Sequence, residues 1–254
     1  MHMSRKQAER RRAIIELLQA DREMKVSKLA EELKVSTETV RCDLDFLAEQ
    51  GQVVKFHGKA CLPRLMKELP LKIRQDENLA VKKAVMRKAV DFIEDGMTVY
   101  LDPGSTILAG MDFLRAKKNL TIVVNSTEVA MKAVELKCRV ILLGGRMDEA
   151  GMRTTGYFAE EMVDKIQIDL AVFGTCGVMP NAGFGIYWDE EIGLRRKILS
   201  AAGKSIVVMD RSKLSTPVNF MFASFEEADA LVCERLDEKE RALLGRVKRL
   251  IETD

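Results

Sequence analysis

Residues 26–44 read VSKLAEELKVSTETVRCDL, and this stretch decides the architecture of the first part of the chain. Ser27 can cap a short helix whose leucine and alanine side chains recur at helical spacing. A two-residue turn follows, and Ser36 can cap another helix that runs to about Gln50 and ends at Gly51. We therefore expect two helices joined by a tight turn, as in a helix-turn-helix.

The flanking sequence completes a winged helix-turn-helix over residues 1–62. Residues 5–20 have the apolar spacing of a further helix. Residues 52–56 and 60–62 have the pattern of two short strands joined by a turn. We expect this hairpin to be a wing that reaches DNA phosphate or the minor groove.

The second helix of the motif has a polar face that suits the major groove. Val40, Leu44 and Leu47 share one side of a helix with about 100° per residue, and Arg41 lies on the opposite side. An arginine in the major groove can form two hydrogen bonds to guanine. The side chains that we expect to contact DNA are Ser36, Thr37, Glu38, Thr39, Arg41, Cys42, His57 and Lys59.

Positive charge is concentrated at the start of the chain. Residues 1–62 hold 12 Lys and Arg against 10 Asp and Glu, whereas the rest of the chain holds 29 of each. The basic side chains at the first predicted helix are Arg5, Lys6, Arg10, Arg11 and Arg12. They either contact DNA phosphate or form a solvated helix face, and charge alone does not separate these alternatives.

Composition argues against several classes of protein. No apolar run approaches the roughly 20 residues of a membrane-spanning helix, and the basic N-terminus lacks the apolar stretch of a secretory signal. The five cysteines form no CxxC pair and the chain has two histidines, so we expect neither a metal site nor a cofactor. Scattered thiols without an export signal point to a reducing cytoplasm.

The pattern changes after residues 63–78, which contain Pro63 and Pro70 and which we interpret as a linker. From residue 79 to residue 254, short apolar segments alternate with helical ones. The predicted strands are residues 98–101, 120–125, 139–143, 169–173, 205–210 and 230–233, and a last helix is predicted over 237–251. This alternation predicts an α/β domain with an open, largely parallel sheet covered on both faces.

The turn after the first of these strands, Asp102-Pro103-Gly104-Ser105-Thr106, has the chemistry of a phosphate cradle. Gly104 lets the backbone approach an oxyanion, and Ser105 and Thr106 offer hydroxyls at a helix start whose dipole favours negative charge. Asp102 could accept hydrogen bonds from ligand hydroxyls. On its own, such a turn is more often plain turn chemistry, so both interpretations stay open.

Further polar or glycine residues follow neighbouring predicted strands, at the edge where open α/β sheets bind ligands. Asn125 ends one predicted strand, and the glycine pair at 144–145 comes at the end of the next. Lys213 comes after the strand at 205–210 and would bring an ammonium group to the same edge. Glu191 lies four residues before Arg195, a spacing that by itself favours a surface ion pair.

Residues 26–44 resemble the helix-turn-helix of the DeoR family of bacterial sugar-metabolism regulators. That family usually has two arginines before Asp-Leu, where this chain has Arg41 and Cys42. It usually has His-Gly-Gly in the wing, where this chain has His57-Gly58-Lys59. The resemblance implies a shared fold. It does not carry over the family's operator sequence, because a cysteine cannot make a bidentate base contact.

The second domain is similar to the DeoR-family effector domain, which resembles ribose-phosphate isomerase. The family pattern Asp-x-Gly-Ser/Thr-Thr matches residues 102–106, its Asp-x-Ser-Lys matches residues 210–213, and its Glu before Lys-Arg matches Glu191. Pro103 is a stiff variant at the free position, and Val81 replaces a usual Glu. The expected effector-binding residues are Asp102, Gly104, Ser105, Thr106, Asn125, Gly144, Gly145, Glu191 and Lys213.

The resemblance covers about residues 5–250 and implies a repressor of a carbohydrate-utilisation operon. A phosphorylated sugar or sugar alcohol would release it from operator DNA. We expect a homo-oligomer, either a dimer or a tetramer. Activation in place of repression stays open.

Two other classes of function stay open. A sugar-phosphate isomerase with a helix-turn-helix appendage would use Glu191 or Asp102 as its general base. The second domain has no Lys-Gly-Gly-Gly segment and no histidine, so we expect no enzyme. The other alternative is a winged helix that binds protein and not DNA. Isomerase turnover would favour the first alternative, and partner binding that is insensitive to salt would favour the second.

Overall fold

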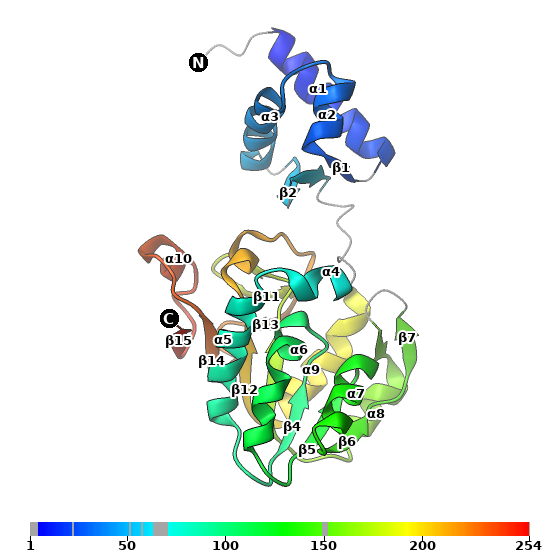
Figure 1. Cartoon of the computed structure of the whole chain (residues 1–254), viewed down its shortest axis with the longest axis vertical. Coiled ribbons are helices and arrows are strands. Elements are labelled where there is room, and N and C mark those ends of the chain that lie inside the picture. The colour runs from blue at the N-terminus through cyan, green and yellow to red at the C-terminus, as the bar shows by residue number, and fades with distance from the viewer. Residues whose placement is uncertain are drawn as a thin grey trace. The chain divides into compact units, whose positions relative to one another are not determined.

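The chain forms two compact units, Met1–Lys67 and Glu68–Asp254 (Figure 1). The computed structural model describes residues 5–21, 23–50, 52–56, 58–62, 71–148 and 152–253. Each unit has a hydrophobic core of its own, which is the mark of a domain.

The first unit combines three helices with a small antiparallel sheet. Its elements are α1 (Arg5–Asp21), β1 (Glu23–Lys25), α2 (Val26–Glu32), α3 (Thr37–Glu49), β2 (Val54–Phe56) and β3 (Lys59–Cys61), with the strand order β1-β3-β2. Leu18 of α1, Leu29 of α2 and Val40 of α3 are fully buried in one cluster. The predicted winged helix-turn-helix is confirmed.

The two predicted helix caps have different outcomes. Ser36 is the N-cap of α3, and its hydroxyl accepts a hydrogen bond from a backbone amide of the first turn, as predicted. The prediction for Ser27 is wrong, because α2 already begins at Val26 and has no side-chain cap. The Val26 amide donates to the Gly58 carbonyl at 2.9 Å, so the hairpin backbone satisfies one end group of this helix.

The second unit is built on a seven-stranded sheet in the order β15-β14-β12-β9-β4-β5-β6. These strands are β4 (Thr98–Leu101), β5 (Thr121–Val124), β6 (Arg139–Leu142), β9 (Ile168–Gly174), β12 (Ala202–Val208), β14 (Ala230–Glu234) and β15 (Leu250–Thr253). Every neighbouring pair is parallel. All six predicted strands are present, and the predicted parallel sheet is confirmed.

Helices cover both faces of this sheet (Figure 1). One face carries α5 (Leu79–Ala89), α6 (Ser105–Gly110) and α7 (Thr127–Glu135), and the other carries α8 (Tyr157–Val163) and α9 (Ile192–Ala201). The side chains of β4 point alternately to the two faces. Val99 and Leu101 pack in the core on the side of α5, α6 and α7, and Tyr100 packs in the core on the side of α8 and α9. A strand that is buried on both faces is continuously apolar in sequence.

Smaller elements complete the second unit. They are the hairpin of β7 (Arg146–Asp148) and β8 (Arg153–Thr155), the antiparallel sheet of β10 (Gly177–Met179), β11 (Gly183–Ile186) and β13 (Phe220–Ser224), and the 3-10 helices η2 (Val90–Phe92), η3 (Met111–Ala116), η4 (Asp189–Glu191) and η5 (Arg211–Ser215). None of these five strands was predicted. The strands β7, β8, β10 and β11 have only three or four residues each, too few for a clear strand pattern. Strand β13 is apolar, but its pairing with the distant β11 cannot be seen in its local sequence.

The prediction of one helix over 237–251 is wrong. The helix α10 (Glu238–Leu243) is short, although Asp237 and Glu240 start it with a reciprocal capping box. Leu250 and Ile251 then enter β15, where they pack toward opposite faces of the sheet. Pairing with β14 outweighs the helical spacing of this segment.

The segment predicted as a linker, residues 63–78, is helical in its second half. Helix α4 (Leu71–Asp76) lies there, and α5 follows from Leu79. Leu71 is buried, so this end of the segment belongs to the packed second unit. The linker prediction therefore does not hold for α4.

Candidate DNA-reading surface and effector site

Helix α3 presents the polar face that the sequence predicts. Val40, Leu44 and Leu47 are buried, while Arg41 and Cys42 are exposed on the other side. Ser36, Thr37 and Glu38 are exposed and Thr39 is half-buried. Arg41 lies 3.2 Å from the Glu38 carboxylate, so its guanidinium is held at the surface by a single neighbour along the helix.

The basic side chains of α1 divide into two groups. Arg10 and Arg11 donate through Nε to the carboxylate of Asp43, which is buried in α3. The Arg11 guanidinium also stacks 3.7 Å from the ring centroid of Phe46. These two arginines bind α1 to α3, so the interpretation as a solvated helix face is wrong for them. Arg12 is exposed and pairs with a glutamate of α1.

In the wing, Lys59 forms an ion pair with a neighbouring strand. Its ammonium group lies 2.6 Å from the Glu23 carboxylate across the pair β1–β3. Gly58 has a φ of +72°, a conformation that suits glycine in the turn. His57, which we predicted to contact DNA, lies outside the described residues.

The predicted effector residues gather at one edge of the large sheet. Asp102, Asn125 and Gly144 follow β4, β5 and β6, and Lys213 follows β12. Since these strands are parallel, their carboxyl ends lie at the same edge. Asp102, Ser105, Thr106, Asn125 and Glu191 are buried, Gly104, Gly144 and Lys213 are half-buried, and Gly145 is exposed.

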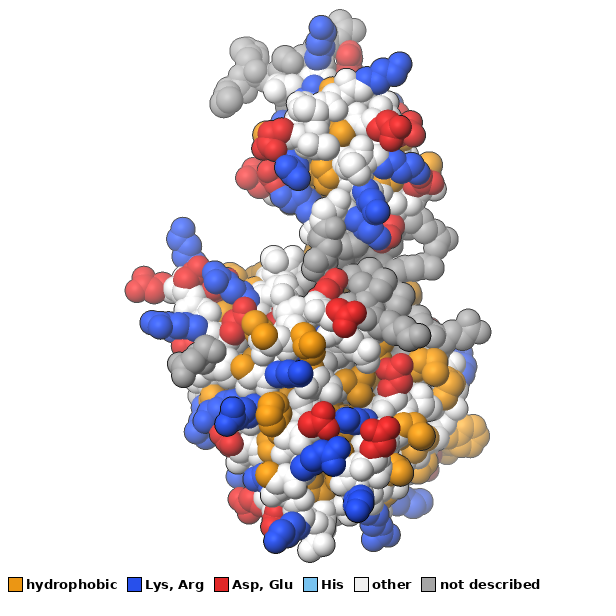
Figure 2. Space-filling view, viewed as in Figure 1, with side chains coloured by type: hydrophobic (Ala, Val, Ile, Leu, Met, Phe, Trp, Pro, Cys, Tyr) orange, Lys and Arg blue, Asp and Glu red, His pale blue; other side chains and the backbone are white. Residues whose placement is uncertain are grey.

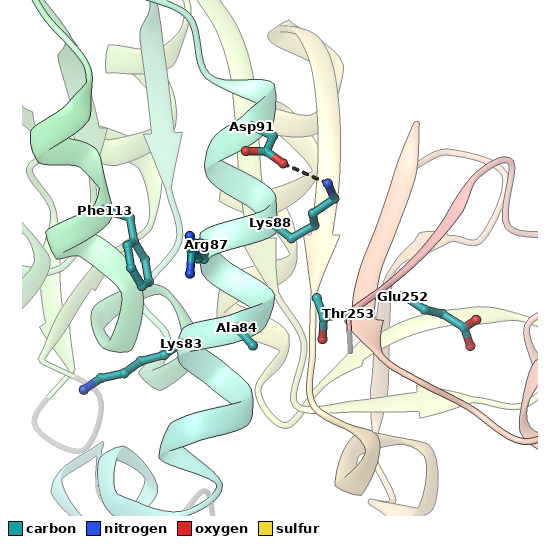
Figure 3. Close-up of a pocket in the computed structure, with 8 residues that line it drawn as sticks. All are labelled: Lys83, Ala84, Arg87, Lys88, Asp91, Phe113, Glu252 and Thr253. Carbon is teal, nitrogen blue, oxygen red and sulfur yellow. Dashed lines mark hydrogen bonds and ion pairs between the residues drawn. The ribbon is translucent and has the colours of Figure 1, made fainter.

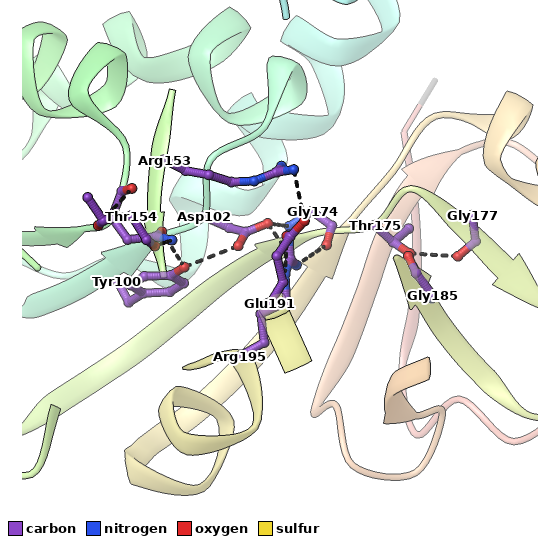
Figure 4. Close-up of polar contacts among 11 residues, drawn as sticks. Tyr100, Asp102, Arg153, Thr154, Gly174, Thr175, Gly177, Gly185, Glu191 and Arg195 are labelled. Carbon is purple, nitrogen blue, oxygen red and sulfur yellow. Dashed lines mark hydrogen bonds and ion pairs between the residues drawn. The ribbon is translucent and has the colours of Figure 1, made fainter. Parts of the chain in front are cut away.

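At the centre of this edge, Asp102 is enclosed by protein groups (Figure 4). One carboxylate oxygen lies 3.0 Å from the Arg195 guanidinium and accepts from the Gly174 amide at 2.9 Å. The other lies 3.1 Å from the Tyr100 hydroxyl, which is 2.9 Å from the side-chain oxygen of Asn125. The predicted contact of Asp102 with ligand hydroxyls is therefore not available in this conformation.

Glu191 bridges two buried arginines. It lies 3.2 Å from Arg195 and 2.9 Å from Arg153, and all three side chains are almost fully buried. The interpretation of Glu191 and Arg195 as a surface ion pair is wrong, because η4 and the start of α9 turn this pair inward. The two carboxylates and the two arginines balance in charge, which a buried cluster requires.

Burial changes the protonation energetics of this network. Removal from water raises the pKa of Asp102, although Arg195 and the Gly174 amide oppose the shift. Burial also works against the charge of Arg195, but Asp102 and Glu191 more than offset it and raise its pKa. Arg195 is consequently a permanent cation at the centre of the edge.

A second polar cluster lies at the end of β12. Asp210 accepts hydrogen bonds at 3.1 Å from the side chain of Asn78 and from the Ser212 amide. Its second carboxylate oxygen is buried without a hydrogen-bond partner among the described residues. Burial alone would raise the pKa of Asp210, but the charges of Lys213 and Lys82 and the bonds from Ser212 lower it. This cluster therefore has two ammonium groups, those of Lys82 and Lys213, close enough to Asp210 to lower its pKa.

Several residues of the two clusters were not predicted from the sequence. Arg153 belongs to β8, a strand that was not predicted, and nothing in its local sequence marks it. Tyr100 has the sequence context of an ordinary strand residue, although its hydroxyl lies 2.9 Å from the side chain of Asn125. Lys82 lies in a helix and was not singled out, and its burial lowers its pKa. The helical spacing of Arg195 from Glu191 was visible, but its burial was not.

Gly145 has a packing reason to be glycine. Its φ is +137°, and a Cβ there would lie 2.6 Å from the Thr155 carbonyl oxygen of β8. Only glycine allows the chain after β6 to approach β8 so closely. Its role at the edge is therefore at least structural.

A surface hollow lies away from these clusters, along the outer side of α5 (Figure 3). It is lined by Lys83, Ala84, Arg87, Lys88, Asp91, Phe113, Glu252 and Thr253. Lys88 and Asp91 pair at 2.9 Å within it. None of the predicted effector residues lines it, so we place the candidate site at the sheet edge.

Among the described residues, no group of three or more His, Cys, Asp or Glu side chains could hold a metal ion. No helix in the same part of the chain is long and apolar enough to cross a membrane.

Comparison with known families matches both units. The profile described as "DeoR C terminal sensor domain" matches residues 77–235. The profile described as "DeoR-like helix-turn-helix domain" matches residues 10–64. Together they span both clusters of the sheet edge and the whole recognition motif.

Individual relatives are regulators by name. The glycerol-3-phosphate regulon repressor of Escherichia coli (strain K12) is 28% identical over 227 residues, covering 89% of this chain and 90% of the relative. The HTH-type transcriptional repressor GlcR of Bacillus subtilis (strain 168) is 28% identical over 236 residues, covering 91% and 89%. Among solved structures, a D-ribose-5-phosphate isomerase in complex with phospho-erythronic acid is 25% identical, with a TM-score of 0.40 and 52% of each chain covered.

Proposed function

Because this chain belongs to the DeoR family of helix-turn-helix regulators, we propose that it is a DNA-binding transcriptional repressor. In this proposal it acts in the cytoplasm on a carbohydrate-utilisation operon. A phosphorylated sugar or sugar alcohol releases it from the operator. The names of its relatives are those of regulators, and we propose that it is not an enzyme.

The observation that carries the DNA-binding part is the exposed face of α3. Arg41 and Cys42 project from a helix whose opposite side is buried in the domain core. A helix of this kind inserts its first turns into the major groove, while the wing contacts the backbone. Since such domains read two half-sites about one helical turn apart, the repressor acts as a homo-oligomer.

The proposal of an effector site depends on the cationic side chains at the carboxyl edge of the large sheet. Lys213 and Lys82 lie by the end of β12, and the turn at 104–106 offers amides and hydroxyls at the end of β4. We place the phosphate of the effector between these groups, because charge-assisted hydrogen bonds are the strong ones. Asp102 and Glu191 then have a supporting role, in which they hold Arg195 and Arg153 in position.

The experiment is a thermal-shift screen of the full chain against a panel of sugar phosphates and glycerol 3-phosphate. A ligand stabilises the folded state by RT ln(1 + [L]/Kd), so at equal concentration a tighter effector raises Tm more, with the logarithm of its affinity. The same ligand should weaken binding to operator DNA, and the operator should weaken the ligand by the same factor.

Calorimetry with and without operator tests this reciprocity. Equal effector affinity in both titrations would contradict the switch. Isomerase turnover of any panel member by the purified chain would favour the enzyme alternative.

A further inference from the structure

The exposed apolar side chains of the second unit are concentrated in one region. The described residues include ten large exposed hydrophobic side chains, and seven of them fall between residues 131 and 158. We call these seven the β6-edge patch: Met131, Val134, Leu142, Met147, Met152, Tyr157 and Phe158. Tyr157 and Phe158 are 68% and 71% exposed, which is unusual for aromatic residues in a folded domain.

The patch surrounds the last strand of the large sheet. Leu142 lies on β6 itself, Met131 and Val134 lie on α7 over one face, and the two aromatic residues begin α8 over the other. Figure 2 shows hydrophobic side chains gathered on the side of the molecule where Figure 1 places α7, α8 and β7. The patch therefore flanks this end of the sheet on both faces.

Its size is that of the apolar part of a protein interface. Aromatic side chains bury roughly 150–250 Å² each, so Tyr157 and Phe158 at their exposed fractions present about 300 Å² together. The five aliphatic side chains are 40–65% exposed and add to this area. The largest apolar patch of a typical monomer covers roughly 300–600 Å² and is often functional. A standard interface buries about 800 Å² on each partner, so the patch can supply the apolar centre of a dimer interface whose polar rim supplies the rest.

The strand at its centre, β6, is the last strand of the sheet among the described residues. On one side β6 pairs with β5, and on its outer side no described strand pairs with it. Charged residues and prolines usually protect an edge from pairing, but the sequence Arg-Val-Ile-Leu has one charged residue and no proline. An edge of this kind can pair with another chain.

We propose that the β6-edge patch is the interface between two copies of this chain. A two-fold axis brings the same patch of each copy together, which is the commonest arrangement of soluble homodimers. The charged side chains near the start of β6, Glu135, Lys137 and Arg139, are exposed and form part of a polar rim. The proposal shares with the proposed function only the expectation of an oligomer, and its test uses neither DNA nor effector.

The interface is connected to the effector edge through β8. The Thr154 amide donates to the Asn125 carbonyl at 2.7 Å, and its hydroxyl donates to the Leu143 carbonyl at 2.6 Å. Arg153 binds Glu191 in the buried network, and Tyr157 follows this strand after one glycine. Strand β8 therefore connects the buried network to the start of α8, which carries both aromatic residues.

The test is sedimentation equilibrium of the full chain and of three variants. Val134→Glu and Phe158→Glu put a charge into the patch, whereas Met221→Glu puts one on β13, where Met221 is 42% exposed and outside the patch. Loss of a central anchor costs at least about thirtyfold in affinity, and each substitution occurs twice in a symmetric interface. The dissociation constant should rise roughly a thousandfold in the patch variants and stay unchanged in the Met221 variant.

Each outcome supports or overturns the proposal. A dimeric parent chain that becomes monomeric, or a tetrameric one that falls to dimers, supports it when circular dichroism shows intact folding. A monomeric parent chain at tens of micromolar overturns it, as do patch variants that keep the parent's state. A photoreactive benzoylphenylalanine at position 158 should cross-link to residues 131–158 of the second copy, and cross-links to any other region would overturn the two-fold arrangement.

Discussion

Two glutamate–arginine pairs of this protein have the same length and opposite surroundings. Glu38 and Arg41 on α3 lie 3.2 Å apart with side chains 75% and 62% exposed. Glu191 and Arg195 at the start of α9 also lie 3.2 Å apart, but each is only 5% exposed. The sequence places both pairs at helical spacing. Burial therefore separates a pair that can exchange partners from one that is fixed in the fold.

The difference follows from solvation. An exposed pair contributes about 0–1 kcal/mol, so Arg41 can leave Glu38 for a base or a phosphate at little cost. A buried pair has lost its water, so removing one partner leaves an uncompensated charge. The first unit has Arg41 at its surface, whereas the second unit has Arg153 and Arg195 buried at the carboxyl edge of its large sheet.

The largest effect is expected from Arg195→Ala. The change leaves the carboxylates of Asp102 and Glu191 buried without their shared cation, so the free energy of unfolding should fall by about 3–5 kcal/mol. The fluorescence of Trp188, the one tryptophan of the chain, reports this because it lies beside η4 in the second unit.

The control is the neighbouring residue Arg196. It pairs with Glu227 at the surface, and Arg196→Ala should cost no more than about 1 kcal/mol. Equal losses for the two variants in urea titrations would show that burial does not separate these pairs.

Lys213→Ala should act on the effector and not on the fold. Loss of one charge-assisted hydrogen bond weakens binding by about 1.5–3 kcal/mol, or roughly ten- to a hundredfold. Operator affinity without effector should stay unchanged, so the variant should resist release. Calorimetry with the ligand found in the thermal-shift screen measures this.

Lys204→Ala is the matched control, because Lys204 is exposed near the start of the same strand, away from the effector edge. Unchanged effector binding by the Lys213 variant would remove this lysine from the site.

How well the sequence predicted these sites depended on how far apart in the chain the interacting residues are. The surface of α3 could be predicted because it needs only helical spacing and one cap, both of which are local. The charges at Asp102, Glu191 and Arg195 were visible as residues, but their convergence depends on strand order and on the inward turn of η4. Arg153 could not be found because β8 lacks the apolar alternation that marks a strand. The orientation of Arg10 and Arg11 likewise depends on the distant Asp43.

Arg41→Ala should reduce operator affinity with little change in stability. A bidentate base contact contributes about 1–3 kcal/mol of discrimination, whereas the exposed pair with Glu38 contributes at most about 1 kcal/mol to folding. Fluorescence anisotropy with an operator duplex at fixed salt measures the first, and thermal unfolding measures the second. Unchanged operator affinity with an intact fold would exclude Arg41 from recognition.

The smallest effect concerns the two serines that the sequence marked as caps. Ser36 caps α3 in the structure and Ser27 caps nothing, so Ser36→Ala should cost about 1 kcal/mol and Ser27→Ala only a few tenths. Far-UV circular dichroism detects this loss, while Trp188 fluorescence should not change because the second unit is untouched. The weakened cap loosens the turn that presents Arg41, so operator affinity should fall modestly for Ser36→Ala. Equal stability losses for the two serines would contradict the cap geometry, and a shift in Trp188 fluorescence would mean that the two units unfold together.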